Sequence, residues 1–318
     1  MQKGAEEQNF PNNNMLNKGF LWYFVIHLNS SSSPCTPYRR LFGMLYSVGS
    51  PLAEYRARAS IEAADADNQI RDDEYARRYG FHAGLVPGIS VFAYMSRPLV
   101  DLMERDWLQH GSAEVRFVRP IHDGEEIRVT GSVSSLSKDG TICIDYQAAN
   151  NQGVPCGIGR AQLPAHAPEP EPSMENYPAG KSRLRRPISL ESLQPGEFLT
   201  PLISEFTWNV HWQYCRKSIR DYHALYEKAL HPGWILSRAS RILASNYAIP
   251  AWIDVSCEVQ NYRLQEEECL VETRGRVHGK YERGGDHFIV LDLAVFARNH
   301  CLQTIRYTAI FHIALSAA

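Results

Sequence analysis

The turn over residues 80–88, which ends in Pro87-Gly88, is the part of the sequence best suited to hold a ligand. An apolar, helix-forming segment opens at Pro87-Gly88, and proline is favoured in the first turn of a helix. The first N–H groups of a helix lack partners within it and carry the positive end of its dipole. Gly88 has no side chain, so another group can approach closely. The turn could therefore stabilise an oxygen that develops negative charge; a plain connection into the helix is the alternative.

Titratable side chains near this turn are candidates for proton transfer. His82 lies six residues before Gly88, and imidazole is the usual acid–base group near neutral pH; a surface histidine is the alternative. Asp72 could act as a base if it is removed from water, or it could pair with Arg71. Asp73 is better suited to cap a helix N terminus. We take Asp72, His82 and Gly88 as the candidate catalytic residues.

The chain contains an internal repeat, and sequence elements recur in the same order. Two segments that start at Glu114 and Glu258 align without a gap over twenty residues at an offset of 144. The other matches, first copy before second, are Ile70-Arg71-Asp72 with Ile219-Arg220-Asp221, Pro87-Gly88 with Pro232-Gly233, Arg119 with Arg263, and Gly131 with Gly275. The same order found twice predicts two copies of one structural unit.

Each copy predicts a short strand, a polar helical stretch, an apolar helix that opens at Pro-Gly, and several alternating strands. This order favours an α+β fold in which an antiparallel sheet wraps around one helix. The proline-rich residues 166–196 predict a linker. We therefore expect an N-terminal domain at 52–165, a C-terminal domain at 197–318 and a poorly ordered leader at 1–51.

The composition argues against several function classes. With 33 Lys and Arg against 35 Asp and Glu, the net charge of −2 offers no basic field for nucleic acid. The apolar run at 20–28 is too short to cross a membrane, although it could be a signal-peptide core. Seven scattered cysteines without a C-x-x-C pair favour a reducing compartment. We expect a cytoplasmic protein with no metal, nucleic-acid or membrane partner.

The duplicated order of elements, together with Asn68, Ile70 and the Val86-Pro87-Gly88 turn, resembles MaoC-like dehydratases, or (R)-specific enoyl-CoA hydratases. The resemblance covers residues 52–316 and is strongest at 68–102. It implies a tandem double hotdog fold, in which each half is a central helix wrapped by an antiparallel sheet. It also implies an acyl-CoA or acyl-carrier thioester as the substrate, no separate cofactor, and a pseudo-dimer within one chain that could form a homodimer.

The residues of the family's acid–base dyad are replaced. In the family, an Asp-x-Asn-Pro-x-His run supplies the dyad, and a glycine at the helix start supplies an N–H group to the thioester oxygen. Here Arg71 stands at the His position, and Ala66, flanked by Asp65 and Asp67, stands at the Asp position. Arginine stays protonated and cannot serve as a base. The resemblance thus implies an acyl-thioester hydratase or dehydratase with a non-standard dyad; a non-catalytic acyl-CoA binding protein and a hotdog thioesterase remain open.

The resemblance also implies which residues contact the substrate. In double hotdog hydratases one half is often degenerate and accommodates the acyl chain, a role that suits the second copy. The candidate substrate-binding residues are Asn68, Arg71, Val86 and Pro87 in the first copy and His231, Gly233, Trp234 and Tyr247 in the second. Packing against Trp234 is the alternative for His231. Arg119 and Arg263 could meet coenzyme A phosphates, or they could simply be solvated.

Overall fold

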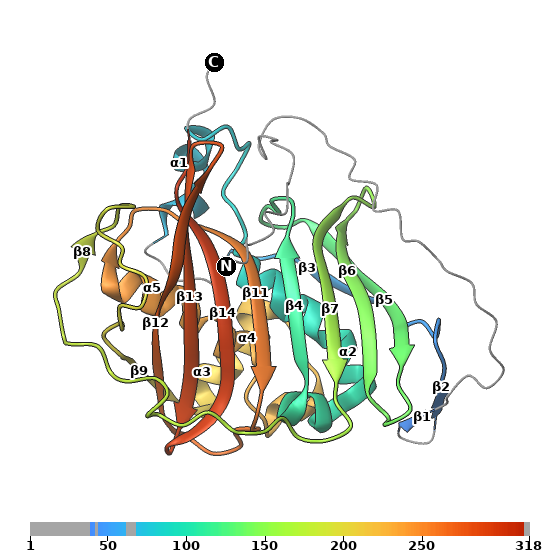
Figure 1. Ribbon diagram of the computed structural model, residues 1–318. Helices are drawn as coiled ribbons and strands as arrows, with labels where there is room; N and C mark the ends of the chain where they lie inside the picture. The colour runs from blue at the N-terminus through green and yellow to red at the C-terminus, as the bar shows by residue number, and fades with distance from the viewer. Residues whose placement is uncertain (1–38, 42–43, 62–67, 315–318) are drawn as a thin grey trace, which may run out of the picture.

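The computed structural model describes residues 39–41, 44–61 and 68–314 (Figure 1). Most of the predicted leader lies outside the described residues. Asp65, Ala66 and Asp67, which bear on the replaced dyad, lie outside them as well.

Ten strands form one antiparallel sheet in the order β3-β5-β6-β7-β4-β11-β14-β13-β12-β9. The first half supplies β3 (Tyr55–Arg58), β4 (Ser112–Phe117), β5 (Glu126–Leu136), β6 (Ile142–Asn150) and β7 (Pro155–Leu163). The second half supplies β9 (Leu202–Phe206), β11 (Ile253–Asn261), β12 (Cys269–Arg283), β13 (Asp286–Ala297) and β14 (His300–His312). The short pairs are β1 (Arg39–Leu41) with β2 (Met44–Tyr46), and β8 (Arg186–Pro187) with β10 (Tyr247–Ala248).

The long helices lie together on one face of this sheet, behind it in Figure 1. The helices are α1 (Asp73–Arg77), α2 (Gly88–His110), α3 (Trp208–Gln213), α4 (Pro232–Leu236) and α5 (Arg238–Asn246), with the shorter helical turns η1 (Gln69–Arg71), η2 (Tyr214–Ile219) and η3 (Ala224–Glu227). The α+β arrangement of a sheet around a central helix is confirmed. In the second half that helix is divided into α4 and α5, with only Ser237 between them.

The two halves join where β4 pairs with β11, at the centre of the sheet. Glu114 lies directly opposite Glu258 in this antiparallel pair, and these two residues begin the repeated segments at the offset of 144. Equivalent residues that face each other across an antiparallel pair lie on a pseudo-two-fold axis. The strand order reads the same way outward from this axis on both sides, so the sheet itself carries the symmetry of the repeat.

Helix α2 is enclosed on all sides at its start. All nine residues from Gly88 to Ser96 are buried, as expected for a helix inside a core rather than on a surface. Its N-cap, Pro87, offers no side-chain hydrogen bond. The free N–H groups at the start of α2 therefore need partners from elsewhere in the fold.

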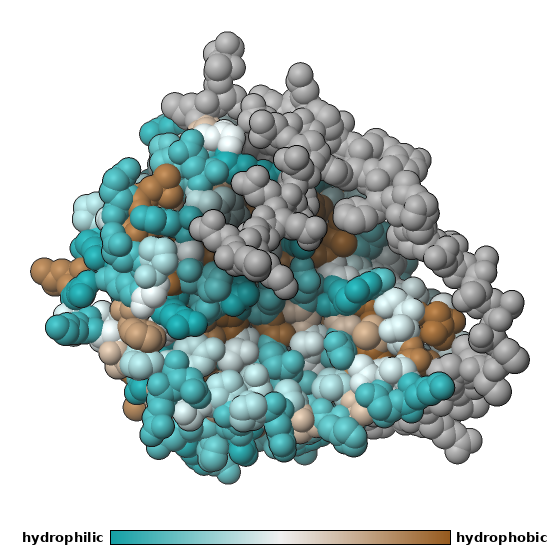
Figure 2. All heavy atoms as spheres, viewed as in Figure 1, coloured by the Kyte–Doolittle hydropathy of each residue, from teal (hydrophilic) through white to brown (hydrophobic). Residues whose placement is uncertain are grey.

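The segment at 166–196 packs on the outer face of the second half of the sheet. Met174 and Tyr177 contact a buried cluster formed by Ala294, Phe296 and Cys301. Strand β13 is therefore covered on both faces over its last five residues, Leu293–Ala297, all of which are buried. The rest of the face seen in Figure 2 is mostly hydrophilic with small hydrophobic areas between, as alternating strands produce.

Gly131 and Gly275 are the two glycines that match between the copies. We predict that adding a methyl group at either one destabilises the fold. A Cβ on Gly275 would lie 2.4 Å from the Asp292 carbonyl oxygen, and a Cβ on Gly131 would lie 2.6 Å from the Cβ of Tyr146. We expect Gly275→Ala and Gly131→Ala each to lower the free energy of unfolding by about 1–3 kcal/mol through overpacking. Urea titration monitored by circular dichroism measures this.

The control for this prediction is Gly279→Ala. Gly279 lies in the same strand as Gly275, and a Cβ there would meet nothing within 4 Å. We expect this variant to stay within about 0.5 kcal/mol of the wild type. Equal effects of Gly275→Ala and Gly279→Ala would contradict the packing argument.

Candidate functional site at the start of helix α2

The turn before α2 fits closely against η1 and β11. A Cβ on Gly84 would lie 1.8 Å from the Arg71 carbonyl oxygen, and a Cβ on Gly88 would lie 2.5 Å from the ring of Phe117 and 2.8 Å from the Cβ of Asp254. Only glycine permits approaches this close. The packing of this turn therefore requires Gly88, which the sequence singled out, and also Gly84.

Asp254, on β11 of the second half, supplies the missing cap for α2. Its Oδ2 accepts a hydrogen bond from the Ile89 N–H group at 3.2 Å, and its Oδ1 accepts one from the Tyr307 hydroxyl. Asp254 is 7% exposed. A carboxylate at a helix N terminus is stabilised by the dipole and by the free N–H groups. The second half thus places a negative group where the sequence predicted that an oxygen with negative charge would bind.

The surroundings of Asp254 shift its proton affinity. Burial raises the pKa of Asp254, while the Tyr307 hydroxyl, the Ile89 and Gly88 N–H groups and the charge of Arg71 act in the opposite direction, and the net shift is upward. A carboxyl group whose pKa is raised holds its proton closer to neutral pH. The fold therefore favours the protonated form of Asp254 more than water does.

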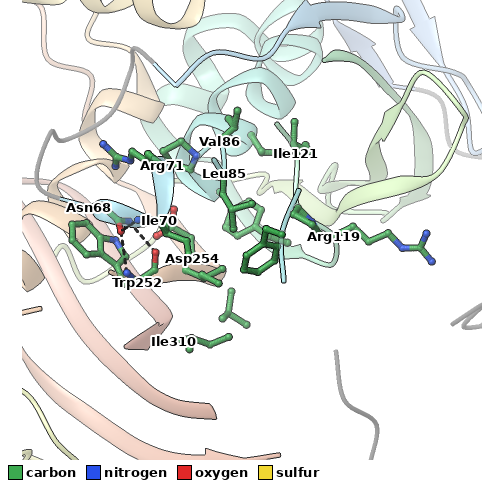
Figure 3. Close-up of a pocket in the computed structure, with 18 of the residues that line it drawn as sticks. Asn68, Ile70, Arg71, Leu85, Val86, Arg119, Ile121, Trp252, Asp254 and Ile310 are labelled. Carbon is green, nitrogen blue, oxygen red and sulfur yellow. Dashed lines mark hydrogen bonds between the residues drawn. The ribbon is translucent and has the colours of Figure 1, made fainter. Parts of the chain in front are cut away.

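Asn68 joins the two halves beside this carboxylate. Its Oδ1 accepts the Trp252 N–H group at 3.0 Å, and its Nδ2 donates to the Trp252 carbonyl at 2.9 Å (Figure 3). The Oδ1 also accepts the Ile70 N–H group at 3.4 Å and caps η1. The side-chain amide of Asn68 is thus bonded to protein backbone across 184 residues of sequence.

A cavity of about 90 Å³ lies between the two halves at the start of α2 (Figure 3). Apolar side chains from both halves, such as Leu85, Phe117 and Ile310, form much of its wall. The predicted residues among its lining are Asn68, Arg71, Val86, Pro87 and Gly88, and the lining also includes Arg119 and Asp254. The cavity therefore gathers every predicted residue of the first copy except Asp72 and His82.

Asp72 and His82 lie outside this lining. Asp72 is exposed and caps α1, because its Oδ1 accepts the Tyr75 N–H group at 2.9 Å. Asp73 instead accepts the Gly84 N–H group at 2.8 Å and holds the turn. The His82 side chain is exposed and lies against the ring of His122. The structure thus does not bring Asp72 and His82 together with Gly88 at the cavity, and their catalytic roles stay predictions.

The four predicted residues of the second copy lie in the core of that half and outside the cavity lining. His231 is fully buried, and its Nδ1 accepts the Gly233 N–H group at 2.9 Å, so it caps α4. Trp234 packs beneath the Arg238 guanidinium, 4.0 Å from its ring centroid. Tyr247 is 1% exposed. These contacts favour packing for His231, Gly233, Trp234 and Tyr247, and their contact with a substrate stays a prediction.

Asp254 and Tyr307 are not among the residues predicted from the sequence. A signal for Asp254 existed at the start of β11. It follows the large apolar Trp252 by two residues, and the period of two then predicts an inward-facing side chain. A carboxylate at an inward position is rarely left unpaired. Its partner could not be read from the sequence, because Ile89 is 165 residues away.

Replacing Asn68 tests the junction of the halves. Asn68→Ala leaves the buried N–H and carbonyl groups of Trp252 without their partner, and each unsatisfied group costs about 1–3 kcal/mol. We expect the free energy of unfolding to fall by about 2–4 kcal/mol. Urea unfolding measures this, with the exposed neighbour Gln69→Ala as control. A change no larger than that of the control would refute the junction role.

Replacing Asp254 tests its pKa shift. Because the pKa is raised in the fold, the native protein binds this proton more tightly than the unfolded chain, whose Asp pKa is about 3.9. The stability that Asp254 contributes is therefore full below that pH and is lost as the pH rises through the folded pKa. We therefore compare the free energy of unfolding of the wild type with that of Asp254→Asn. We expect the difference, wild type minus variant, to fall as the pH rises above about 4.

Tyr307→Phe provides the companion measurement. It removes the hydroxyl donor that favours the ionised form of Asp254, so we expect the loss of stability to extend to higher pH. A wild-type stability that rises with pH relative to Asp254→Asn would mean that Asp254 is stabilised in its ionised form.

Comparison with known proteins identifies the fold. No family model matches the chain, and no curated protein matches it. A structure described as a MaoC domain protein dehydratase from Chloroflexus aurantiacus J-10-fl matches with a TM-score of 0.62 and 13% identity, over 89% of this chain and 100% of that one. A MaoC-like dehydratase matches with a TM-score of 0.56 and 11% identity, over 83% and 98%.

A third match is RV0216, a conserved hypothetical protein from Mycobacterium tuberculosis that is described as having a double hotdog fold. Its TM-score is 0.56 and its identity 13%, over 81% of this chain and 96% of that one. The likeness is thus one of fold, and it spans both halves. The chain has the double hotdog fold found in MaoC-like proteins, which confirms the predicted fold class and the resemblance from which it was drawn.

Proposed function

We propose that the cavity at the start of α2 binds the acyl part of an acyl thioester, whose thiol part is coenzyme A or an acyl carrier, and that the protein hydrates or dehydrates the acyl part. The observation that carries the proposal is the buried carboxylate of Asp254, held against the N terminus of α2 in a cavity between two hotdog halves. None of the described helices is long and apolar enough to cross a membrane.

In the proposed reaction, Asp254 takes the place of the acid–base dyad. Its carboxylate accepts a proton from water as the water oxygen forms a bond to C3 of an enoyl thioester. The electron pair of the C2–C3 double bond moves towards the thioester carbonyl, whose oxygen gains negative charge. Asp254 then returns the proton to C2, which yields the 3-hydroxyacyl thioester; dehydration runs the same steps in reverse.

The remaining residues support this chemistry by charge and shape. Arg71 lowers the pKa of Asp254 through its positive charge, so it favours the ionised form that must accept a proton. The Gly88 and Ile89 N–H groups, which now face Asp254, stabilise the thioester oxygen once the carboxyl is protonated and its hold on them weakens. The apolar wall of the cavity excludes water from the acyl chain.

The test is an enoyl-CoA hydration assay with short and medium acyl chains, followed for both hydration and release of free thiol. We expect Asp254→Asn to lower the hydration rate by about 10²–10⁴-fold, the usual contribution of a general acid–base group. Asparagine keeps the shape of aspartate and still caps a helix, so the variant should fold. Asp145→Asn, a change to an exposed residue that pairs with Arg160, is the matched control.

Other outcomes would overturn the proposal. A loss of activity in His82→Ala but not in Asp254→Asn would place the chemistry at the turn instead. Free thiol without hydration would make the protein a thioesterase. Binding of acyl-CoA in calorimetry without turnover of either kind would make it a non-catalytic binding protein.

A further inference from the structure

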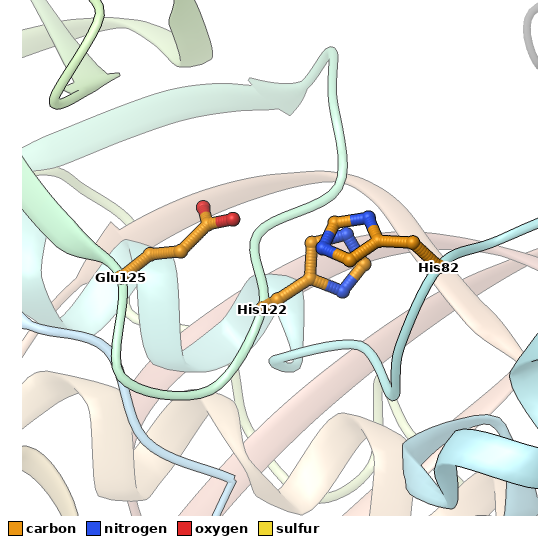
Figure 4. Close-up of side chains that lie close together, drawn as sticks. All are labelled: His82, His122 and Glu125. Carbon is orange, nitrogen blue, oxygen red and sulfur yellow. The ribbon is translucent and has the colours of Figure 1, made fainter.

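Three side chains of types that can bind metal ions lie close together, outside the lining of the cavity. His82 comes from the turn before α2, and His122 and Glu125 come from the loop between β4 and β5. One donor atom from each lies within 4.8 Å of the other two. Figure 4 shows the two imidazole rings and the Glu125 carboxylate directed towards a common space. No other trio of His, Cys, Asp or Glu in the described residues is gathered this closely.

The backbone fixes the two loops that carry these residues. Leu85 and His122 form an antiparallel bridge, and the Val86 N–H group donates to the Ile121 carbonyl at 2.8 Å. On the other side, the Glu125 N–H group donates to the His122 carbonyl at 3.2 Å. The ligand positions are therefore held by the fold before any ion binds, which reduces the entropy lost on binding.

The hydrogen bond of His122 presents its other nitrogen as a ligand. His122 is 6% exposed, and its Nδ1 lies 3.0 Å from the Gly84 carbonyl oxygen. A carbonyl can only accept, so Nδ1 carries the proton and the neutral ring has its lone pair on Nε2. A ring N–H that donates to a backbone carbonyl while the second nitrogen stays free is the usual support of a metal-binding histidine.

The His82 and His122 rings lie in contact with each other. Their centroids are 3.5 Å apart. Metal ions bind the neutral imidazole ring, and the hydrogen bond to the Gly84 carbonyl leaves the lone pair of that ring on Nε2. A cation between the rings and the Glu125 carboxylate would satisfy all three groups at once.

We propose that His82, His122 and Glu125 form a binding site for one divalent transition-metal ion of the zinc class. Two imidazoles and a carboxylate suit zinc and its first-row neighbours, whereas Ca²⁺ and Mg²⁺ require mainly oxygen ligands. Zinc bonds to such ligands measure about 2.1 Å, which puts two donors of a tetrahedral site about 3.4 Å apart. A pair of donors at the 4.8 Å limit therefore closes by about 1.4 Å. The exposed His82 side chain can make that movement.

Three protein ligands leave one position of a tetrahedral zinc ion open. His82 is exposed, so water or a small anion can occupy that position. The site also clamps the turn before α2 to the loop before β5, at a point where the same turn lines the cavity with Leu85 and Val86. The proposal stands without the acyl-thioester function, because it uses none of the residues assigned to the proposed chemistry.

The experiment is calorimetric titration of the full chain with Zn²⁺ after treatment with a chelator. We expect one equivalent to bind, with at least tenfold weaker binding in His82→Ala and in Glu125→Gln. Both changes affect side chains near the surface, so folding should be retained, and circular dichroism checks this. Co²⁺ in place of Zn²⁺ should give the intense visible absorption of a tetrahedral site in the wild type and lose it in both variants.

The matched control is His278→Ala. His278 is an exposed histidine with a carboxylate partner, Asp292, at 2.8 Å, and it lies outside the proposed site, so zinc affinity should not change. Three results would overturn the proposal. They are absence of Zn²⁺ binding by the wild type, binding that neither His82→Ala nor Glu125→Gln weakens, and binding of Ca²⁺ or Mg²⁺ as strong as that of Zn²⁺.

Discussion

The N terminus of α2 needs hydrogen-bond acceptors inside the core, and much of the site depends on this requirement. All residues from Gly88 to Ser96 are buried, and an unsatisfied buried donor costs about 1–3 kcal/mol. Asp254 meets the need from the other half of the chain. Its burial raises its pKa, and its Cβ and the Phe117 ring leave no room for a side chain at position 88. The burial of Asp254 against the start of α2 therefore both caps the helix and raises the pKa of the carboxyl group.

The two halves meet the same requirement with different chemistry. In the second half, His231 caps α4 through its own Nδ1, and its Nε2 lies 3.6 Å from the buried Asp221. Asp221 in turn accepts a hydrogen bond from Arg97 of α2 at 2.6 Å. A local cap of this kind leaves the start of α4 enclosed within a cluster of buried polar side chains. The pseudo-symmetric fold thus supports a cavity beside one helix start and packing beside the other.

The fold was largely readable from the sequence, and the site only in part. The offset of 144 that matches Glu114 with Glu258 was visible in the sequence and became the central pair of the sheet. The Val86-Pro87-Gly88 turn could be predicted because proline favours the first turn of a helix and glycine allows a close approach. Asp254 was missed because its role depends on a contact across 165 residues, which alternation alone does not reveal. Asp72 could act as a base only if it were removed from water, and in the fold it is exposed and its carboxylate caps α1.

The turn before α2 has two sides, and their independence follows from how it is held. Gly84 donates its N–H group to Asp73, and its carbonyl oxygen faces the ring of His122. Leu85 donates to the Ile70 carbonyl and bridges to His122. Because backbone bonds fix the turn on both sides, an ion at His82 and His122 does not need to move Gly88, and a ligand beside Asp254 does not need to move His82. One rigid turn can therefore serve two sites without coupling them, since coupling requires an element with two alternative arrangements.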